Sequence, residues 1–172
     1  MCGIVGYIGT EQAAPIILDG LSKLEYRGYD SAGMAIFDGE KINTRKAVGR
    51  LKVLENLTHG GENMKGTSGI GHTRWATHGA PSDINSHPHM NNAGTIAVVH
   101  NGIIENYIPL KKKMQDKGYQ FVSETDTEVL AHLLDYYYKG NPLEAITKVL
   151  HRVEGSCLLY TSDAADDTPC VD

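Results

Sequence analysis

The stretch Cys2-Gly3-Ile4-Val5-Gly6-Tyr7-Ile8 sets the expected fold, because it places a cysteine at the head of an apolar strand. If Met1 is removed, Cys2 carries a thiol and a free α-amino group, with reference pKa values near about 8.5 and about 7.7–8.0. The amine can then take the thiol proton, directly or through one water, as in an N-terminal nucleophile. The alternative is that Cys2 is a small buried apolar residue, and these residues alone favour that alternative.

Length and composition are typical of one globular domain, with 172 residues, 41% hydrophobic and 22% charged. The net charge of −5 and the lack of a basic stripe argue against nucleic acid as a partner. No apolar run approaches the roughly 18 residues of a membrane span, and no signal peptide precedes Cys2. We therefore expect a cytoplasmic protein without a membrane partner.

The end of the chain reads differently from the rest. The segment from Cys157 to Asp166 looks like the translation of a transposase-type sequencing adapter, so we predict that residues 157–172 are a non-native tail. The alternative is a natural acidic tail. Without this tail Cys2 is the only cysteine, so neither a disulfide nor a cysteine metal site is expected.

Strand and helix patterns alternate along residues 1–156 and indicate one α+β domain. Strands are predicted over 2–8, 33–37, 41–47, 68–72 and 95–100, and helices over 14–24, 51–57 and 106–117. The strands 33–37 and 41–47 are expected to lie around a turn at Asp38-Gly39. Two further helices are predicted from capping boxes, Thr125-Asp126-Thr127-Glu128 and Asn141-Pro142-Leu143-Glu144. The irregular stretch 73–92 is long enough to be a functional loop.

Charged and aromatic residues in two segments suit capture of a small zwitterion. The guanidinium of Arg74 can grip a carboxylate while the indole of Trp75 covers the ligand. Alternatively, Arg74 is a surface ion-pair partner and Trp75 a core aromatic. Asp126, at a predicted helix start, is free to hold an ammonium group if Thr125 and Glu128 do the capping.

Asn101-Gly102 follows an apolar strand and has two interpretations. The residues alone favour a type I′ hairpin turn, whereas the functional interpretation is an oxyanion hole made by the Asn101 amide and the Gly102 backbone N–H.

Five histidines invite a metal interpretation, but their spacing does not match a metalloprotease pair, and we expect no metal site. They are His72, His78, His87, His89 and His100.

Four segments together resemble one family, the glutamine-dependent amidotransferases of the N-terminal-nucleophile class. The segments are Tyr26-Arg27-Gly28-Tyr29-Asp30-Ser31-Ala32-Gly33, Gly71-His72-Thr73-Arg74-Trp75-Ala76-Thr77-His78-Gly79, His100-Asn101-Gly102-Ile103-Ile104-Glu105-Asn106 and Ser123-Glu124-Thr125-Asp126-Thr127-Glu128. The resemblance covers 1–156 and is strongest to the branch that makes glucosamine 6-phosphate. It implies a four-layer αββα sandwich of two antiparallel sheets, here incomplete at its C-terminus.

The resemblance also implies roles for individual residues. Cys2 would attack the side-chain amide of L-glutamine with its own α-amino group as base, and Asn101 and Gly102 would hold the oxyanion. Arg74 would bind the α-carboxylate and Asp126 the α-ammonium. Further residues would line or cover the pocket or lie near the N-terminal amine: Trp75, Thr77, His78 and His87 in the first group, Arg27 and Gly28 in the second. No cofactor is implied.

Members of this branch continue into two sugar-isomerase domains that bind fructose 6-phosphate and receive the ammonia, and we expect the full-length protein to be a homo-oligomer. Those domains are absent from this sequence. The alternatives are the glutaminase domain of amidophosphoribosyltransferase, an inert fragment, a non-catalytic amino-acid-binding module, and a histidine-rich metal-binding domain.

Overall fold

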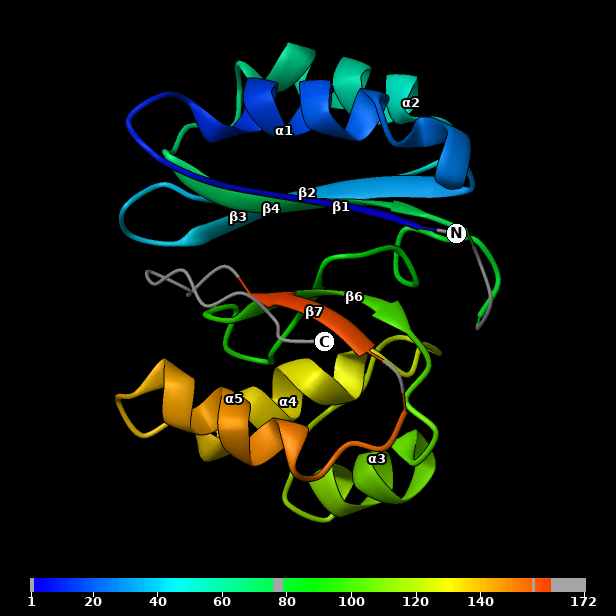
Figure 1. The fold of residues 1–172 in the computed structure, drawn as a ribbon, viewed down its shortest axis with the longest axis vertical. Coiled ribbons are helices and arrows are strands. Elements are labelled where there is room, and N and C mark those ends of the chain that lie inside the picture. Colours follow the sequence, from blue (N-terminus) through cyan, green and yellow to red (C-terminus); the bar gives the residue numbers. More distant parts are fainter. Residues whose placement is uncertain (1, 76–78, 156, 162–172) are drawn as a thin grey trace.

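A computed structural model describes residues 2–75, 79–155 and 157–161, with side chains described as far as residue 155. The described residues form four layers, in the order helices, sheet, sheet, helices (Figure 1). This arrangement confirms the predicted α+β class and the αββα sandwich.

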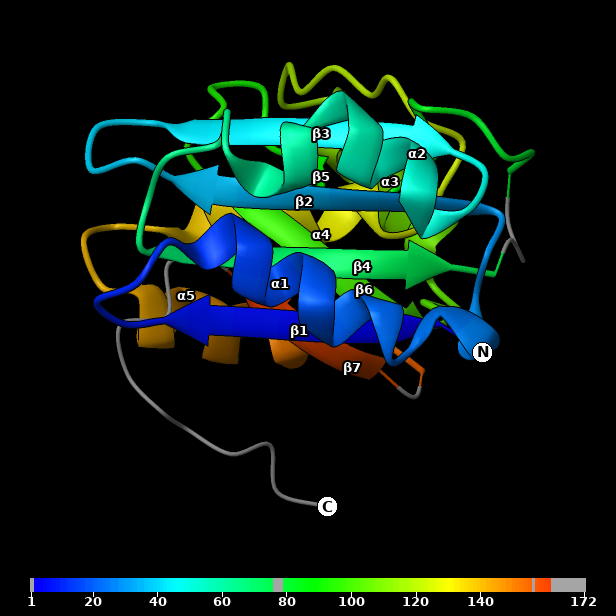
Figure 2. The same ribbon diagram turned by 90° about the horizontal axis from the view of Figure 1, so that it is seen from above.

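The first sheet is antiparallel, with strand order β1-β4-β2-β3. Its strands are β1 (Gly3–Ile8), β2 (Ser31–Phe37), β3 (Ile42–Val48) and β4 (Ser68–Arg74). Its outer face is covered by α1 (Ala13–Ser22) and α2 (Leu51–Leu57), as Figure 2 shows from above. Short 3₁₀ turns follow these helices at Glu25–Arg27 and His59–Gly61. The predicted hairpin between β2 and β3 is present, and Asp38 Oδ1 accepts the N–H groups of Glu40 and Lys41, both at 2.9 Å.

The second sheet has strand order β5-β6-β7 and is also antiparallel. Its strands are β5 (His89–Met90), β6 (Ala97–Gly102) and β7 (Cys157–Thr161). The layer below it consists of α3 (Tyr107–Gln115), α4 (Glu128–Tyr137) and α5 (Pro142–Leu150). β7 lies inside the segment predicted to be a non-native tail and pairs with β6 from Val98↔Thr161 to Gly102↔Cys157.

The predicted hairpin turn at Asn101-Gly102 is wrong. Both residues belong to β6 and are its last two positions, in register with Leu158 and Cys157. The backbone of this dipeptide pairs with the neighbouring strand β7. This pairing between distant parts of the chain overrides the local preference of Asn-Gly for a turn.

The predicted capping box at Thr125–Glu128 is also wrong, because α4 begins at Glu128 without a side-chain cap. The Glu128 carboxylate instead accepts hydrogen bonds from the backbone of Val122 and Ser123 at 2.9 and 2.7 Å. The second predicted cap is confirmed, since Asn141 Oδ1 accepts the Glu144 N–H at 3.2 Å.

The two sheets pack through apolar side chains on their inner faces, among them Ala35, Ile70, Ala97 and Val99. One end of this interface brings together the start of β1 and the ends of β4 and β6, where the candidate site lies. Among the residues described, α1 and α4 have ten residues each, and no helix is long and apolar enough to cross a membrane.

Candidate active site

Cys2 lies half-buried at the start of β1, beside the end of β4. The pairing of Gly3 with Thr73 sets this position. The backbone N–H of Trp75 donates to Cys2 Sγ at 3.2 Å, and Sγ lies 3.6 Å from the Trp75 carbonyl oxygen. The thiol is therefore fixed by backbone groups immediately after Arg74.

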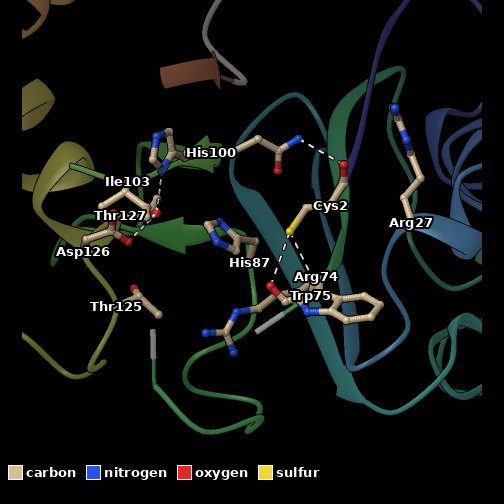
Figure 3. Close-up of a pocket in the computed structure, with 12 residues that line it drawn as sticks. Cys2, Arg27, Arg74, Trp75, His87, His100, Ile103, Thr125, Asp126 and Thr127 are labelled. Carbon is tan, nitrogen blue, oxygen red and sulfur yellow. Dashed lines mark hydrogen bonds between the residues drawn. The ribbon is translucent and has the colours of Figure 1, made fainter. Parts of the chain in front are cut away.

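Cys2 opens into a pocket of about 360 Å³ between the two sheets (Figure 3). Its lining residues come from both halves of the chain: Cys2, Arg27, Arg74, Trp75, His87, His100, Asn101, Gly102, Ile103, Thr125, Asp126 and Thr127. The volume is at the lower end of the range for small-molecule sites, about 300–1,000 Å³, and suits a ligand the size of an amino acid.

Arg74 and Asp126 give this pocket one cation and one anion, both almost fully buried. Arg74 Nη2 donates to the Gly79 carbonyl oxygen at 3.2 Å. Burial lowers the pKa of Arg74, and the nearby Cys2, Asp30 and Asp126 oppose that effect. Asp126 Oδ2 accepts the Ile104 N–H at 2.8 Å, which leaves the carboxylate held in place with acceptor capacity remaining. Such a pair can bind both charged ends of a free amino acid.

Asn101 joins the two sheets next to the thiol. Its Nδ2 donates to the Cys2 carbonyl oxygen at 3.3 Å, and its Oδ1 lies 2.9 Å from Nε2 of His72 on β4. Gly102 lines the same pocket and is exposed. The side-chain amide is thus close to any group that is bound to Cys2.

His87 forms a wall of the pocket within a group of buried histidines. Its ring stacks on His72 at 4.2 Å and meets His89 edge-on at 4.7 Å. Burial lowers the pKa of all three, to about 4 for His72, to about 3 for His89 and well below the usual value for His87. In the described part of the chain, no group of three histidine, cysteine or acidic side chains is arranged to hold a metal ion.

The remaining predicted site residues surround Cys2. Arg27 lines the pocket on the other side of Cys2 from Asp126 in Figure 3. Gly28 packs so closely on β4 that an added Cβ would lie 2.8 Å from the Arg74 carbonyl carbon. Trp75 is 44% exposed and touches Tyr29 edge-on. Thr77 and His78 lie outside the described residues.

Four pocket residues were not predicted as ligand contacts: His100, Ile103, Thr125 and Thr127. They flank the predicted residues Asn101, Gly102 and Asp126, so proximity in sequence was the available signal. His100 Nδ1 and Thr127 Oγ1 lie 3.0 Å apart, which places the β6 end against the α4 start.

Comparison with known families and curated proteins gives consistent results. Residues 72–170 match a family described as the glutamine amidotransferase domain. A protein of Caldanaerobacter subterraneus subsp. tengcongensis named glutamine–fructose-6-phosphate aminotransferase [isomerizing] is 65% identical over 159 residues, covering 92% of this chain and 26% of that protein. The protein of the same name from Thermus thermophilus is 53% identical over 156 residues, covering 91% and 26%. The chain thus spans about a quarter of the length of these curated relatives.

Solved structures of similar fold are less similar in sequence. Glutamine phosphoribosylpyrophosphate amidotransferase from B. subtilis has a TM-score of 0.80 and 30% identity, covering 94% of this chain and 35% of that one. A structure described as the allosteric regulatory enzyme of purine biosynthesis has a TM-score of 0.77 and 32% identity, covering 94% and 36%.

Proposed function

The chain belongs to the glutamine amidotransferase domain family, and from this we propose that it hydrolyses the side-chain amide of L-glutamine to glutamate and ammonia. The observation that carries the proposal is the content of one pocket. A thiol, an amide donor and a pair of opposite charges line the same pocket of about 360 Å³. Cys2, Asn101, Arg74 and Asp126 are the residues concerned.

The proposed reaction begins with removal of Met1, which frees the α-amino group of Cys2. This amine takes the thiol proton, and Sγ attacks the glutamine side-chain carbonyl carbon, forming an S–C bond and an oxyanion. Collapse of the tetrahedral intermediate breaks the C–N bond, and the nitrogen leaves as ammonia with the proton held by the amine. Water then adds to the thioester, the S–C bond breaks, and glutamate and the Cys2 thiol are released.

The oxyanion would be held by Asn101 Nδ2 and the Gly102 backbone N–H. Asn101 Nδ2 donates to the Cys2 carbonyl oxygen at 3.3 Å, and both residues line the same pocket. Removing one such donor typically costs about 10²–10³ in kcat.

Arg74 and Asp126 would select glutamine as a free amino acid by binding its α-carboxylate and α-ammonium. Trp75, His87, Thr77 and His78 would line or cover the bound substrate, and Arg27 and Gly28 would lie near the Cys2 amine. Excluding water from the closed pocket would protect the thioester and keep ammonia for transfer.

In the whole protein, we propose that ammonia passes to sugar-isomerase domains that convert fructose 6-phosphate to glucosamine 6-phosphate. The names of the curated relatives support this branch over amidophosphoribosyltransferase, since the glutamine phosphoribosylpyrophosphate amidotransferase of B. subtilis is only 30% identical to the chain. We further propose that the whole protein is a cytoplasmic homo-oligomer. We also propose that residues 157–172 are non-native, which sequencing the gene beyond Ser156 would test.

Intact-mass spectrometry before and after exposure to a diazo-ketone analogue of glutamine tests the proposed site. We expect loss of Met1, one label on Cys2, protection by excess glutamine, and no label on Cys2→Ser. Glutamate release measured on the same samples tests turnover. An unlabelled, inactive chain that circular dichroism shows to be folded would overturn the proposal.

A further inference from the structure

The contact between His72 and Asn101 crosses from one sheet to the other beside the candidate nucleophile. His72 is 1% exposed and sits on β4, and its Nε2 lies 2.9 Å from Oδ1 of Asn101 on β6. A carboxamide oxygen can only accept a hydrogen bond. The contact therefore requires that Nε2 of His72 carries the proton.

This hydrogen bond, together with the one that Nδ2 donates to the Cys2 carbonyl oxygen, sets which end of the Asn101 amide faces Cys2. With Oδ1 held by His72, Nδ2 is directed to the Cys2 carbonyl oxygen at 3.3 Å. If the Asn101 amide were flipped by 180° about its Cβ–Cγ bond, its carbonyl oxygen would face the reacting carbon instead. It would then repel the negative charge that develops there rather than stabilise it.

The surroundings of His72 hold the ring in one protonation state. Burial lowers the pKa of His72 to about 4, although the Asn101 hydrogen bond opposes the effect, so the ring is neutral at pH 7. His87 stacks on the ring at 4.2 Å and is itself kept neutral by burial. A neutral ring has one N–H, and the Asn101 contact assigns it to Nε2.

We propose that His72 is a positioning residue whose Nε2–H fixes the orientation of the Asn101 amide in the oxyanion hole. The inference rests on the proposed glutaminase function. His72 does not line the pocket, so it acts on the reaction through its neighbours, of which Asn101 is the one it hydrogen-bonds.

The tautomer is tested on the folded chain without any substrate. Long-range ¹H–¹⁵N correlation spectra of protein labelled with ¹⁵N-histidine distinguish Nε2–H, Nδ1–H and the imidazolium. The His72 signals are identified as those lost in His72→Gln. We expect the Nε2–H form at pH 7 and still at pH 5.5. An Nδ1–H or charged ring at pH 7 would overturn the proposal.

Kinetics test the effect on catalysis through two variants of the same residue. His72→Leu removes the donor, whereas the amide of His72→Gln can still donate to Asn101 Oδ1. We expect His72→Leu to lower kcat for glutamine about 10²-fold, the effect of losing one oxyanion donor, with KM changed by less than about threefold. His72→Gln should recover most of the loss.

Alkylation of Cys2 by iodoacetamide separates positioning from general damage, because that reaction needs no oxyanion hole. We expect the alkylation rate of His72→Leu to equal that of the unchanged chain. As a control, His132→Gln changes an equally buried histidine in α4 outside the pocket while keeping an N–H group beside Glu128, and its kcat should not fall.

The outcomes separate the two proposals. An unchanged chain that neither turns over glutamine nor takes the diazo-ketone label overturns the glutaminase function. If the wild-type chain is active and His72→Leu leaves kcat unaffected, only the role of His72 is overturned. A parallel fall in kcat, alkylation rate and substrate affinity would also overturn it, because that pattern indicates a structural role.

Discussion

Acid should unfold this chain, because several neutral histidines are buried around the pocket. His72, His87 and His89 are 1%, 6% and 2% exposed. Burial lowers the pKa from 6.5 to about 4 for His72 and to about 3 for His89, and lowers that of His87 strongly. Below pH 6.5 the unfolded chain binds protons that the folded chain does not, so stability falls as pH falls from 6.5 toward 4.

The magnitude follows from those shifts. At 1.36 kcal/mol per pKa unit, His72 and His89 correspond to about 3 and 5 kcal/mol, which together rival the whole stability of a typical domain. His72, His87 and His89 alone should lower the free energy of unfolding by about 4 kcal/mol per pH unit between pH 6 and 5.

The variant His89→Gln isolates one of these titrations. A glutamine amide can replace the contact of His89 Nε2 with Thr125 Oγ1 at 3.0 Å, but it takes up no proton. In urea unfolding followed by circular dichroism at several pH values, we expect the slope to drop by about 1.4 kcal/mol per pH unit. The control His151→Gln removes an exposed histidine and should leave the slope unchanged. An unchanged slope in His89→Gln would refute the reasoning.

Three further substitutions test how the loop behind the pocket and the start of α4 are held. Lys46 Nζ donates to the carbonyl oxygens of Ser86 (2.8 Å), Ile84 and Pro88 (both 3.3 Å). Lys46→Met should therefore lower the free energy of unfolding, measured in urea, by about 1–3 kcal/mol and raise KM for glutamine. Lys46→Arg should keep most of the stability and most of the substrate affinity. A Cβ at Gly33 would lie 2.1 Å from the His87 carbonyl oxygen, so Gly33→Ala should destabilise by about 1–3 kcal/mol; an unchanged melting temperature would contradict this close approach. Although burial alone would raise it, the neighbouring His132 and hydrogen bonds from Ser123 and Val122 hold the pKa of Glu128 at about 2, so Glu128→Gln should cost about 3 kcal/mol at pH 7. At pH 3 the cost should be about half of that, because the carboxyl group of the unfolded chain is then largely protonated while that of the folded chain is still ionised. Equal costs at both pH values, from urea unfolding, would count against it.

Features with nearby partners in sequence were predicted well. The Asp38 turn and the Asn141 cap depend on residues no more than three positions away, so local preferences decide them. The two errors concern residues whose partners are distant or were not considered. Asn101-Gly102 pairs with β7, and Glu128 bonds backward to Val122 and Ser123 rather than capping its helix.

In the candidate site, too, some features could be predicted from the sequence and others depend on contacts between distant residues. Cys2, Arg74, Asn101 and Asp126 were expected through family resemblance, and the structure brings them to one pocket. The contact of His72 with Asn101 spans 29 positions and crosses between sheets, so no periodicity or spacing in the sequence could have revealed it.

A site assembled from both sheets has a consequence for synthesis on the ribosome. Cys2 is added to the chain on the order of 120 residues before Asp126, and at about 5–20 residues per second this separates them by roughly 6–24 s. During that interval Cys2 exists without its pocket. Its N-terminal side is accessible to aminopeptidases, and its thiol is accessible to oxidants and electrophiles. The pace of translation from Cys2 to Asp126 therefore sets how long the thiol exists before its pocket is complete.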